Sequence, residues 1–266
     1  MCGRYALFTS PERLRALFAL TRLPPPEEAA DDLRPRYNIA PTQRIAIVRA
    51  LAPSADEPRG GRELALVRWG LVPSWAADPE GADLPQMINA RAETAASRPA
   101  FREAFAHRRC LVPADGFYEW KAAENAAGTR RRTPKTPMFV RPRDGSQRGV
   151  FALAGLWERW IPRGGGPADA VESCTILTVA PNPLLAAIHD RMPAIIAPED
   201  YDRWLDPAAG AEDVQPLLGP YPAEHMEAYP VSRAVNTPAH DAPDCIEPAS
   251  ASPPRQTPPR PRAGGR

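Results

Sequence analysis

Short β-type runs separated by loops rich in proline, glycine and charged residues are the feature that most constrains this fold. Such runs predict strands, which we place at residues 45–49, 64–69, 110–113, 117–121, 138–141, 150–157 and 174–179. They rarely alternate with helices, so the pattern favours an α+β fold with a mainly antiparallel core rather than a parallel sheet. No linker inside residues 1–247 is long enough to require two domains.

Helices are predicted at only a few places in the chain. Ser10 offers an N-cap hydroxyl and Pro11 is a favourable first-turn residue, and Leu14, Leu17 and Phe18 then share one helical face. Further helices are predicted at residues 101–107, 183–188 and 199–205. These elements are too few to form a helical core, so we expect them at the periphery.

The charge of the chain is unevenly distributed. The 33 basic and 32 acidic residues sum to +1, but residues 249–266 contain four arginines, many prolines and no acid. Such a segment cannot bury enough apolar surface to fold, so we predict a domain at 2–248 and a disordered tail at 249–266. The body then carries a negative net charge. Any nucleic-acid site on it must be a local arginine patch, for which residues 84–112 are a candidate, although such runs are often solvated helix faces.

Cysteine usage and hydropathy limit the location and the cofactors of the protein. No apolar run approaches the ~18 residues of a membrane span, and no secretion signal opens the chain, so we predict a cytoplasmic protein. Cys2, Cys110, Cys174 and Cys245 lie far apart without a C-x-x-C pair. This spacing argues against a zinc ribbon, a redox motif or a disulfide framework. We therefore expect no metal and no organic cofactor.

Cys2 is the residue with the clearest chemical potential. Removal of Met1 next to a small residue would leave a cysteine with a free α-amine beside its thiol. Only a terminal cysteine can attack an aldehyde through nitrogen and then close a five-membered ring through sulfur. The amine pKa is ~8, so roughly a tenth of it is neutral at pH 7. On position alone, a coincidental cysteine is the competing interpretation.

Several longer motifs favour the chemical interpretation of Cys2. In order, they are MCGRY at 1–5, YNIAPT at 37–42, WGLVPSW at 69–75, INARAET at 88–94, RCLVPADGFYEW at 109–120, IHDRMP at 188–193, VSRAVN at 231–236 and DCIEP at 244–248. This series resembles the SOS response-associated peptidase family of abasic-site-processing proteins over nearly all of residues 2–248. The resemblance implies one α+β domain with an antiparallel, barrel-like core and peripheral helices. It also implies a monomeric DNA-repair protein that joins the nucleoid when DNA is damaged.

The resemblance further implies a reaction and its residues. Cys2 would capture an abasic site in single-stranded DNA as a thiazolidine crosslink, with reversal or lyase chemistry as further steps. Glu119 would move protons, since strand alternation places it with Phe117 on an apolar face that raises its pKa. His189 would protonate the sugar ring oxygen, and Asn89 would hold the amine or a sugar hydroxyl. The competing interpretations are an ion-paired glutamate, a surface histidine and a turn asparagine.

Several further residues are predicted to bind DNA. Arg4, Arg91 and Arg191 each lie two residues from a catalytic residue and are expected to form a phosphate clamp. Trp75 is expected to stack on a base, although such a tryptophan is equally expected in a core. The remaining DNA-binding candidates are Asn38, Pro41 and Arg233.

Two other classes of function stay open. The first is a thiol peptidase acting on other proteins through Cys2, His189 and Asn89, with self-cleavage of Met1 as its minimal form. The second is a non-covalent scaffold for single-stranded DNA. Blocking the α-amine distinguishes the first, because a thiol protease tolerates the block. Replacing Cys2 with serine distinguishes the second, because a scaffold has no covalent product to lose.

Overall fold

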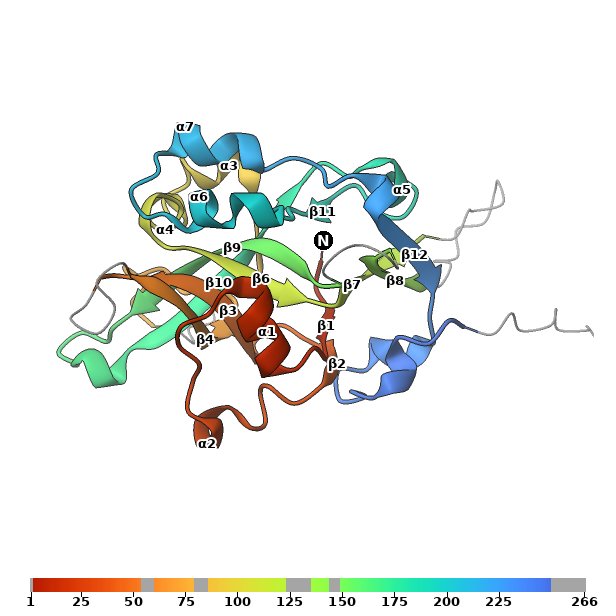
Figure 1. Cartoon of the computed structure of the whole chain (residues 1–266), viewed down its shortest axis with the longest axis horizontal. Coiled ribbons are helices and arrows are strands. Elements are labelled where there is room, and N and C mark those ends of the chain that lie inside the picture. Colours follow the sequence, from red (N-terminus) through yellow and green to blue (C-terminus); the bar gives the residue numbers. More distant parts are fainter. Residues whose placement is uncertain (1, 54–59, 79–85, 123–134, 144–148, 250–266) are drawn as a thin grey trace, which may run out of the picture.

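A closed ring of five strands forms the centre of the molecule. The computed structural model describes residues 2–53, 60–78, 86–122, 135–143 and 149–249. The ring runs β3 (Arg44–Leu51), β4 (Gly61–Trp69), β10 (Val171–Val179), β9 (Phe151–Trp160), β6 (Arg109–Ala114) and back to β3 (Figure 1). This confirms the expected barrel-like core. The predicted disordered tail lies outside the described residues except for Ala249.

One pair of neighbouring strands in the ring is parallel, and it includes β10. Along its length β10 exchanges its pairing partners on both sides. Five strands cannot close with every neighbour antiparallel, and the exception is β4 with β10. Beyond β4, the same side of β10 pairs in parallel with β5 (Asn89–Arg91). The other side pairs first with β9 and then with β11 (Met192–Pro193). The end of β10 therefore brings the segments around residues 89 and 189 together.

A second antiparallel sheet lies beside the barrel. Its order is β12 (Met226–Pro230), β8 (Thr136–Pro142), β7 (Gly116–Lys121), β1 (Tyr5–Leu7) and β2 (Arg36–Ile39). Only Asp115 separates β6 of the barrel from β7 of this sheet. The pairing of Tyr5 with Phe117 directs the chain before β1 along β7, toward Glu119.

The helices are short and lie outside the barrel. They are α1 (Pro11–Phe18), α2 (Pro26–Ala29), α3 (Ala92–Ala95), α4 (Arg102–His107), α5 (Pro183–Ala186), α6 (Tyr201–Leu205) and α7 (Ala211–Val214). Figure 1 shows α3, α4, α6 and α7 together at the top of the view. In α1 the Ser10 hydroxyl accepts from the Arg13 N–H, and Leu14 and Phe18 are buried as predicted. No helix in the described ranges has the length and apolar character to cross a membrane.

Part of the predicted arginine patch is internal. Arg109 is 4% exposed, and its guanidinium donates to backbone carbonyls that include those of Trp204 and Phe105. Arg108 forms an ion pair with Glu158 at 2.8 Å. Both arginines therefore hold α4 and the segment after α6 against the barrel. Arg109 lies within the candidate window of residues 84–112, but it is buried and cannot contribute to a surface patch.

Candidate active site

Cys2, Asn89, Glu119 and His189 come together from four separate segments. The Asn89 side-chain amide donates to the Cys2 carbonyl at 2.9 Å. His189 Nε2 lies 4.0 Å from Glu119 Oε2. The charge of Glu119 also acts on the Cys2 thiol and raises its pKa. The sheet pairing and the end of β10 thus gather the predicted catalytic residues around one point.

Glu119 faces the interior of the molecule. It is 1% exposed, and its neighbour Phe117 belongs to the main core with Cys2. Tyr118 packs on the opposite side, and its hydroxyl donates to the Tyr37 carbonyl at 2.5 Å. This confirms the predicted alternation along β7. Burial raises the pKa of Glu119, and the charge of His189 opposes the shift. A raised pKa makes a carboxyl a better proton acceptor than an ordinary glutamate, which suits a group that accepts and then returns a proton.

Cys2 has an unreactive thiol as it stands. The side chain is 0% exposed, and burial is the largest cause of its raised thiol pKa, followed by the charge of Glu119. The thiol is therefore protonated at neutral pH. Met1 precedes Cys2 in the sequence, so the nitrogen of Cys2 is part of a peptide bond until Met1 is removed. Both nucleophiles need a further event before they can react.

His189 lies in the loop between α5 and β11. Its backbone N–H donates to the Leu185 carbonyl at 2.8 Å, and the buried Asn182 caps α5 by accepting from the Leu185 N–H at 2.9 Å. The Arg191 N–H donates to His189 Nδ1 at 3.1 Å. In the neutral ring this contact assigns the proton to Nε2, which is the nitrogen nearer Glu119. A protonated ring instead offers Nδ1–H to Asp190, at 2.8 Å.

The side-chain oxygen of Asn89 is available to accept a hydrogen bond. Asn89 Oδ1 is buried and has no hydrogen-bond partner within the described ranges. Buried polar atoms of this kind are rare in folded proteins, and they mark places where a ligand or water completes the site. An amine or a sugar hydroxyl placed next to Cys2 would supply the missing donor.

The three arginines predicted as a phosphate clamp differ in their partners. Arg191 forms a bidentate ion pair with Glu93, at 2.7 and 2.8 Å, and also donates to the Thr178 carbonyl. Arg4 donates to Asn38 and to the Val235 carbonyl, both at 2.8 Å. Arg91 is exposed on β5. Two of the three therefore already bind protein groups, and the clamp stays a prediction.

The remaining DNA-binding candidates occupy different environments. Trp75 is 61% exposed, so the expectation of a core tryptophan does not apply to it. Arg233 is exposed at the start of a 3-10 turn, and Pro41 is half-buried in the turn after β2. Asn38 is 1% exposed. Its predicted DNA role stays untested, and it would act through Arg4 rather than by direct contact.

Asn38 fastens the C-terminal segment to β2. Its amide nitrogen donates to the carbonyls of Val235, Thr237 and His240, and its oxygen accepts from Arg4. Replacing Asn38 with alanine removes all four of these hydrogen bonds, so we expect the free energy of unfolding to fall by about 2–3 kcal/mol. Urea denaturation measures the change. The exposed Gln215→Ala serves as control, and an equal effect in both variants would contradict the role of Asn38.

Sequence reasoning missed residues that position the site. Glu93 orients the loop that carries His189 through Arg191, and Asn182 fixes the start of that loop. Glu93 lies within the INARAET motif, so its position was visible, but its partner 98 residues away was not. Trp120 donates from Nε1 to Asn236 at 2.7 Å and connects β7 to the C-terminal segment. Nothing in the local sequence indicates that contact.

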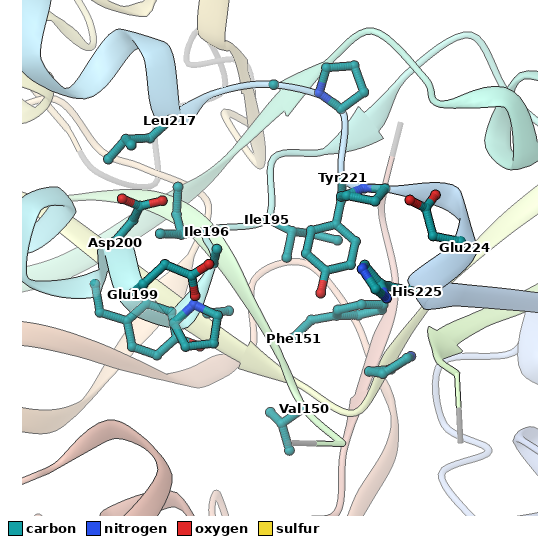
Figure 2. Close-up of a pocket in the computed structure, with 18 of the residues that line it drawn as sticks. Val150, Phe151, Ile195, Ile196, Glu199, Asp200, Leu217, Tyr221, Glu224 and His225 are labelled. Carbon is teal, nitrogen blue, oxygen red and sulfur yellow. The ribbon is translucent and has the colours of Figure 1, made fainter. Parts of the chain in front are cut away.

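A groove of about 830 Å³ is formed by other residues of the chain (Figure 2). Phe151, Ile195, Ile196 and Tyr221 give it an apolar lining, with Glu199, Asp200, Glu224 and His225 among its polar residues. None of the predicted site residues lines it. The two regions are connected through Asn182, whose amide nitrogen donates to the Tyr221 carbonyl at 2.7 Å. The reactive groups thus lie at Cys2 rather than in the groove.

Comparisons with known proteins identify the family of this chain. Residues 1–238 match the family model described as SOS response associated peptidase (SRAP). The chain is 40% identical over 250 residues to the abasic site processing protein YoqW of Bacillus subtilis, covering 93% of this chain and 99% of that protein. It is 31% identical over 254 residues to the abasic site processing protein YedK of Escherichia coli, covering 93% and 100%.

A solved structure shares the fold. A protein from Bacteroides thetaiotaomicron superposes with a TM-score of 0.75 at 26% identity, covering 94% of this chain and 100% of that one. The family model and the YoqW and YedK relatives each span most of this chain. The chain belongs to the SOS response-associated peptidase family.

Proposed function

We propose that this protein senses abasic sites in single-stranded DNA and captures them covalently through Cys2 once Met1 has been removed. The observation that carries the proposal is the convergence of Glu119, His189 and Asn89 on the second residue of the chain. The names of the relatives as abasic site processing proteins support the same substrate. No residue of the proposed chemistry needs a metal or an organic cofactor.

The capture reaction uses the amine first. His189 protonates the ring oxygen of the abasic sugar while the anomeric hydroxyl releases its proton to solvent, which opens the ring and exposes the aldehyde. Glu119 takes a proton from the α-ammonium of Cys2. The amine nitrogen then attacks the carbonyl carbon. The nitrogen passes one proton to the new alkoxide oxygen and releases another to solvent, the resulting hydroxyl leaves as water with the proton from Glu119, and a neutral imine forms.

The thiol reacts second and makes the product stable. Because burial raises the pKa of the Cys2 thiol, it stays protonated until the imine carbon is beside it. The sulfur then bonds to that carbon, and the imine nitrogen receives the proton, which closes the five-membered thiazolidine. The net change is loss of one water. Single strands suit the reaction because a sugar without a paired strand leaves the stack at the lowest cost.

Intact mass spectrometry tests this proposal directly. The purified protein should lack Met1, and after incubation with an oligonucleotide carrying one abasic site it should gain the oligonucleotide mass less one water. A sample acetylated at its α-amine should gain nothing. Retention of Met1, or equal attachment by the acetylated protein, would overturn the proposal.

Peptidase activity, in this proposal, is limited to release of Met1. A protease acting on other proteins through Cys2, His189 and Asn89 has no need of a terminal nucleophile. The burial of Cys2 also favours a reaction within its own chain. Cleavage of an added protein by the α-acetylated enzyme would instead support the general peptidase.

Trp75 provides a test of how undamaged DNA is held. The side chain is 61% exposed, so its removal should leave the fold intact. Stacking on a base contributes ~1–3 kcal/mol, so Trp75→Ala should weaken binding of an undamaged single strand by about 5- to 150-fold. Fluorescence anisotropy measures the affinity, with the exposed Ile161→Ala as control. Unchanged affinity would show that Trp75 does not contact DNA.

A further inference from the structure

A second group of reactive side chains lies on the segment that follows β12. His240 Nε2 is 2.8 Å from Asp244 Oδ1 and 3.0 Å from Oδ2. Cys245 is buried beside them, and the donor atoms of all three residues lie within 4.8 Å of one another. None of the three takes part in the capture reaction. The sequence predicted no metal here because the cluster lacks a familiar spacing.

The turn that carries these residues is held firmly in place. The His240 carbonyl accepts from Asn38 at 2.7 Å and from the Cys245 thiol at 3.4 Å. Between them in sequence, Asp241 accepts from the N–H groups of Tyr37 and Asn38 at 2.5 and 3.0 Å. The donor atoms therefore start from a fixed backbone, which lowers the cost of gathering them around an ion.

We propose that His240, Asp244 and Cys245 form a binding site for a divalent transition-metal ion, with zinc as its occupant and water as the fourth ligand. Imidazole nitrogen, carboxylate oxygen and thiolate sulfur are the donors that zinc takes in proteins. The thiolate disfavours calcium and magnesium, which select oxygen ligands. Two of the three side chains are open to solvent, so an ion can enter.

The distances require only side-chain adjustment. Tetrahedral zinc, with bonds of about 2.0–2.3 Å, places its ligand atoms roughly 3.4–3.6 Å apart. The contact between His240 and Asp244 must therefore open slightly, and the sulfur of Cys245 must move inward. On binding, the proton of the thiol passes to solvent, the neutral imidazole of His240 carries its proton on Nδ1 so that Nε2 can bind the ion, and no electron is transferred. The bound ion would brace the segment that Arg4 and Asn38 hold.

Cobalt titration of the full chain tests the proposal. Metal-free protein in a non-thiol reductant should bind one Co²⁺ and show a thiolate-to-cobalt charge-transfer band with visible ligand-field bands of a tetrahedral site. Zinc should displace the cobalt and raise the Tm. Cys245→Ser should abolish the charge-transfer band. His240→Asn and Asp244→Asn, which change exposed side chains, should weaken cobalt binding at least about tenfold.

Matched variants exclude other sites. The exposed His225→Asn should leave the titration unchanged. A terminal cysteine can itself chelate a metal, so Cys2→Ser is a necessary control. It should also leave the titration unchanged if the ion binds at Cys245. The absence of a charge-transfer band in the wild-type chain would overturn the proposal, as would a band lost in Cys2→Ser and kept in Cys245→Ser. Crosslinking to abasic DNA depends on none of the three ligands, so failure here leaves the proposed function intact.

Discussion

Replacing Cys2 with alanine should abolish the heat-stable crosslink to abasic DNA while leaving a reversible adduct. Alanine is also a small second residue, so Met1 should still be removed and a free α-amine should remain. Residue 2 lies within the electrostatic reach of Glu119, which is 4.0 Å from His189, so we expect its amine to form the imine. Without sulfur the ring cannot close, and the imine hydrolyses. Denaturing electrophoresis after heating should show no shifted band, and borohydride reduction before heating should restore it.

A second cysteine variant makes this result specific. Cys245→Ala removes another buried thiol that lies outside the constellation, and it should crosslink at the wild-type rate. Heat-stable crosslinking by Cys2→Ala at the wild-type yield would show that the thiol takes no part. Failure of Cys2→Ala to be trapped by borohydride would show that the amine does not form the imine. The two readouts thus test nitrogen and sulfur separately.

The sequence predicted the long elements of the fold well and the short ones poorly. Each of the seven predicted strands is present, because runs such as residues 174–179 carry enough apolar residues to show their own pattern. The short strands β1, β5 and β11 were not predicted. A strand of two or three residues is too short to show a hydrophobic periodicity. These segments are extended because they pair with β7 or β10. Closure of the barrel depends on such long-range pairs, and its shape came only from the resemblance.

For the candidate site too, the sequence predicted the local features and missed the long-range contacts. Alternation along β7 was enough to predict that Glu119 faces inward with Phe117. Partners remote in sequence were not predictable. Arg191 and Arg4 were expected to face phosphate because they follow catalytic residues, but Glu93 and Asn38 occupy them in the folded chain. Whether such an arginine binds a protein group or a DNA phosphate depends on residues remote in sequence, which a local sequence pattern does not reveal.

Replacing Glu119 with glutamine should slow crosslinking by about 10²–10⁴-fold, the range of general acid–base catalysis. Glutamine keeps the size of the side chain but can neither take the ammonium proton nor return one to the leaving water. The wild-type rate should fall as pH drops through the pKa of Glu119, which burial raises above the ordinary value of 4.5. The variant should lack this acid limb. Quenched crosslinking time courses across pH measure both effects.

The same substitution should stabilise the protein at neutral pH. Because the folded-state pKa of Glu119 is raised, ionisation favours the unfolded chain, and the penalty appears as pH rises from about 4.5 through the raised pKa. Glutamine resembles the protonated acid and escapes this penalty. Its stability advantage should therefore shrink as pH falls and vanish at and below about 4.5. Urea denaturation at several pH values measures it.

The two effects of Glu119→Gln together separate a catalytic role from a structural one. A glutamate that only supported the fold would lose stability and activity together when changed. A buried catalytic carboxylate lowers the free energy of unfolding at the pH where it is ionised. The variant should therefore crosslink more slowly and be more stable. The exposed Glu28→Gln, which lies away from the constellation, should change neither property. A destabilised Glu119→Gln with an unaltered acid limb would place the proton transfer on another residue, and His189 would then be the remaining acid–base group of the constellation.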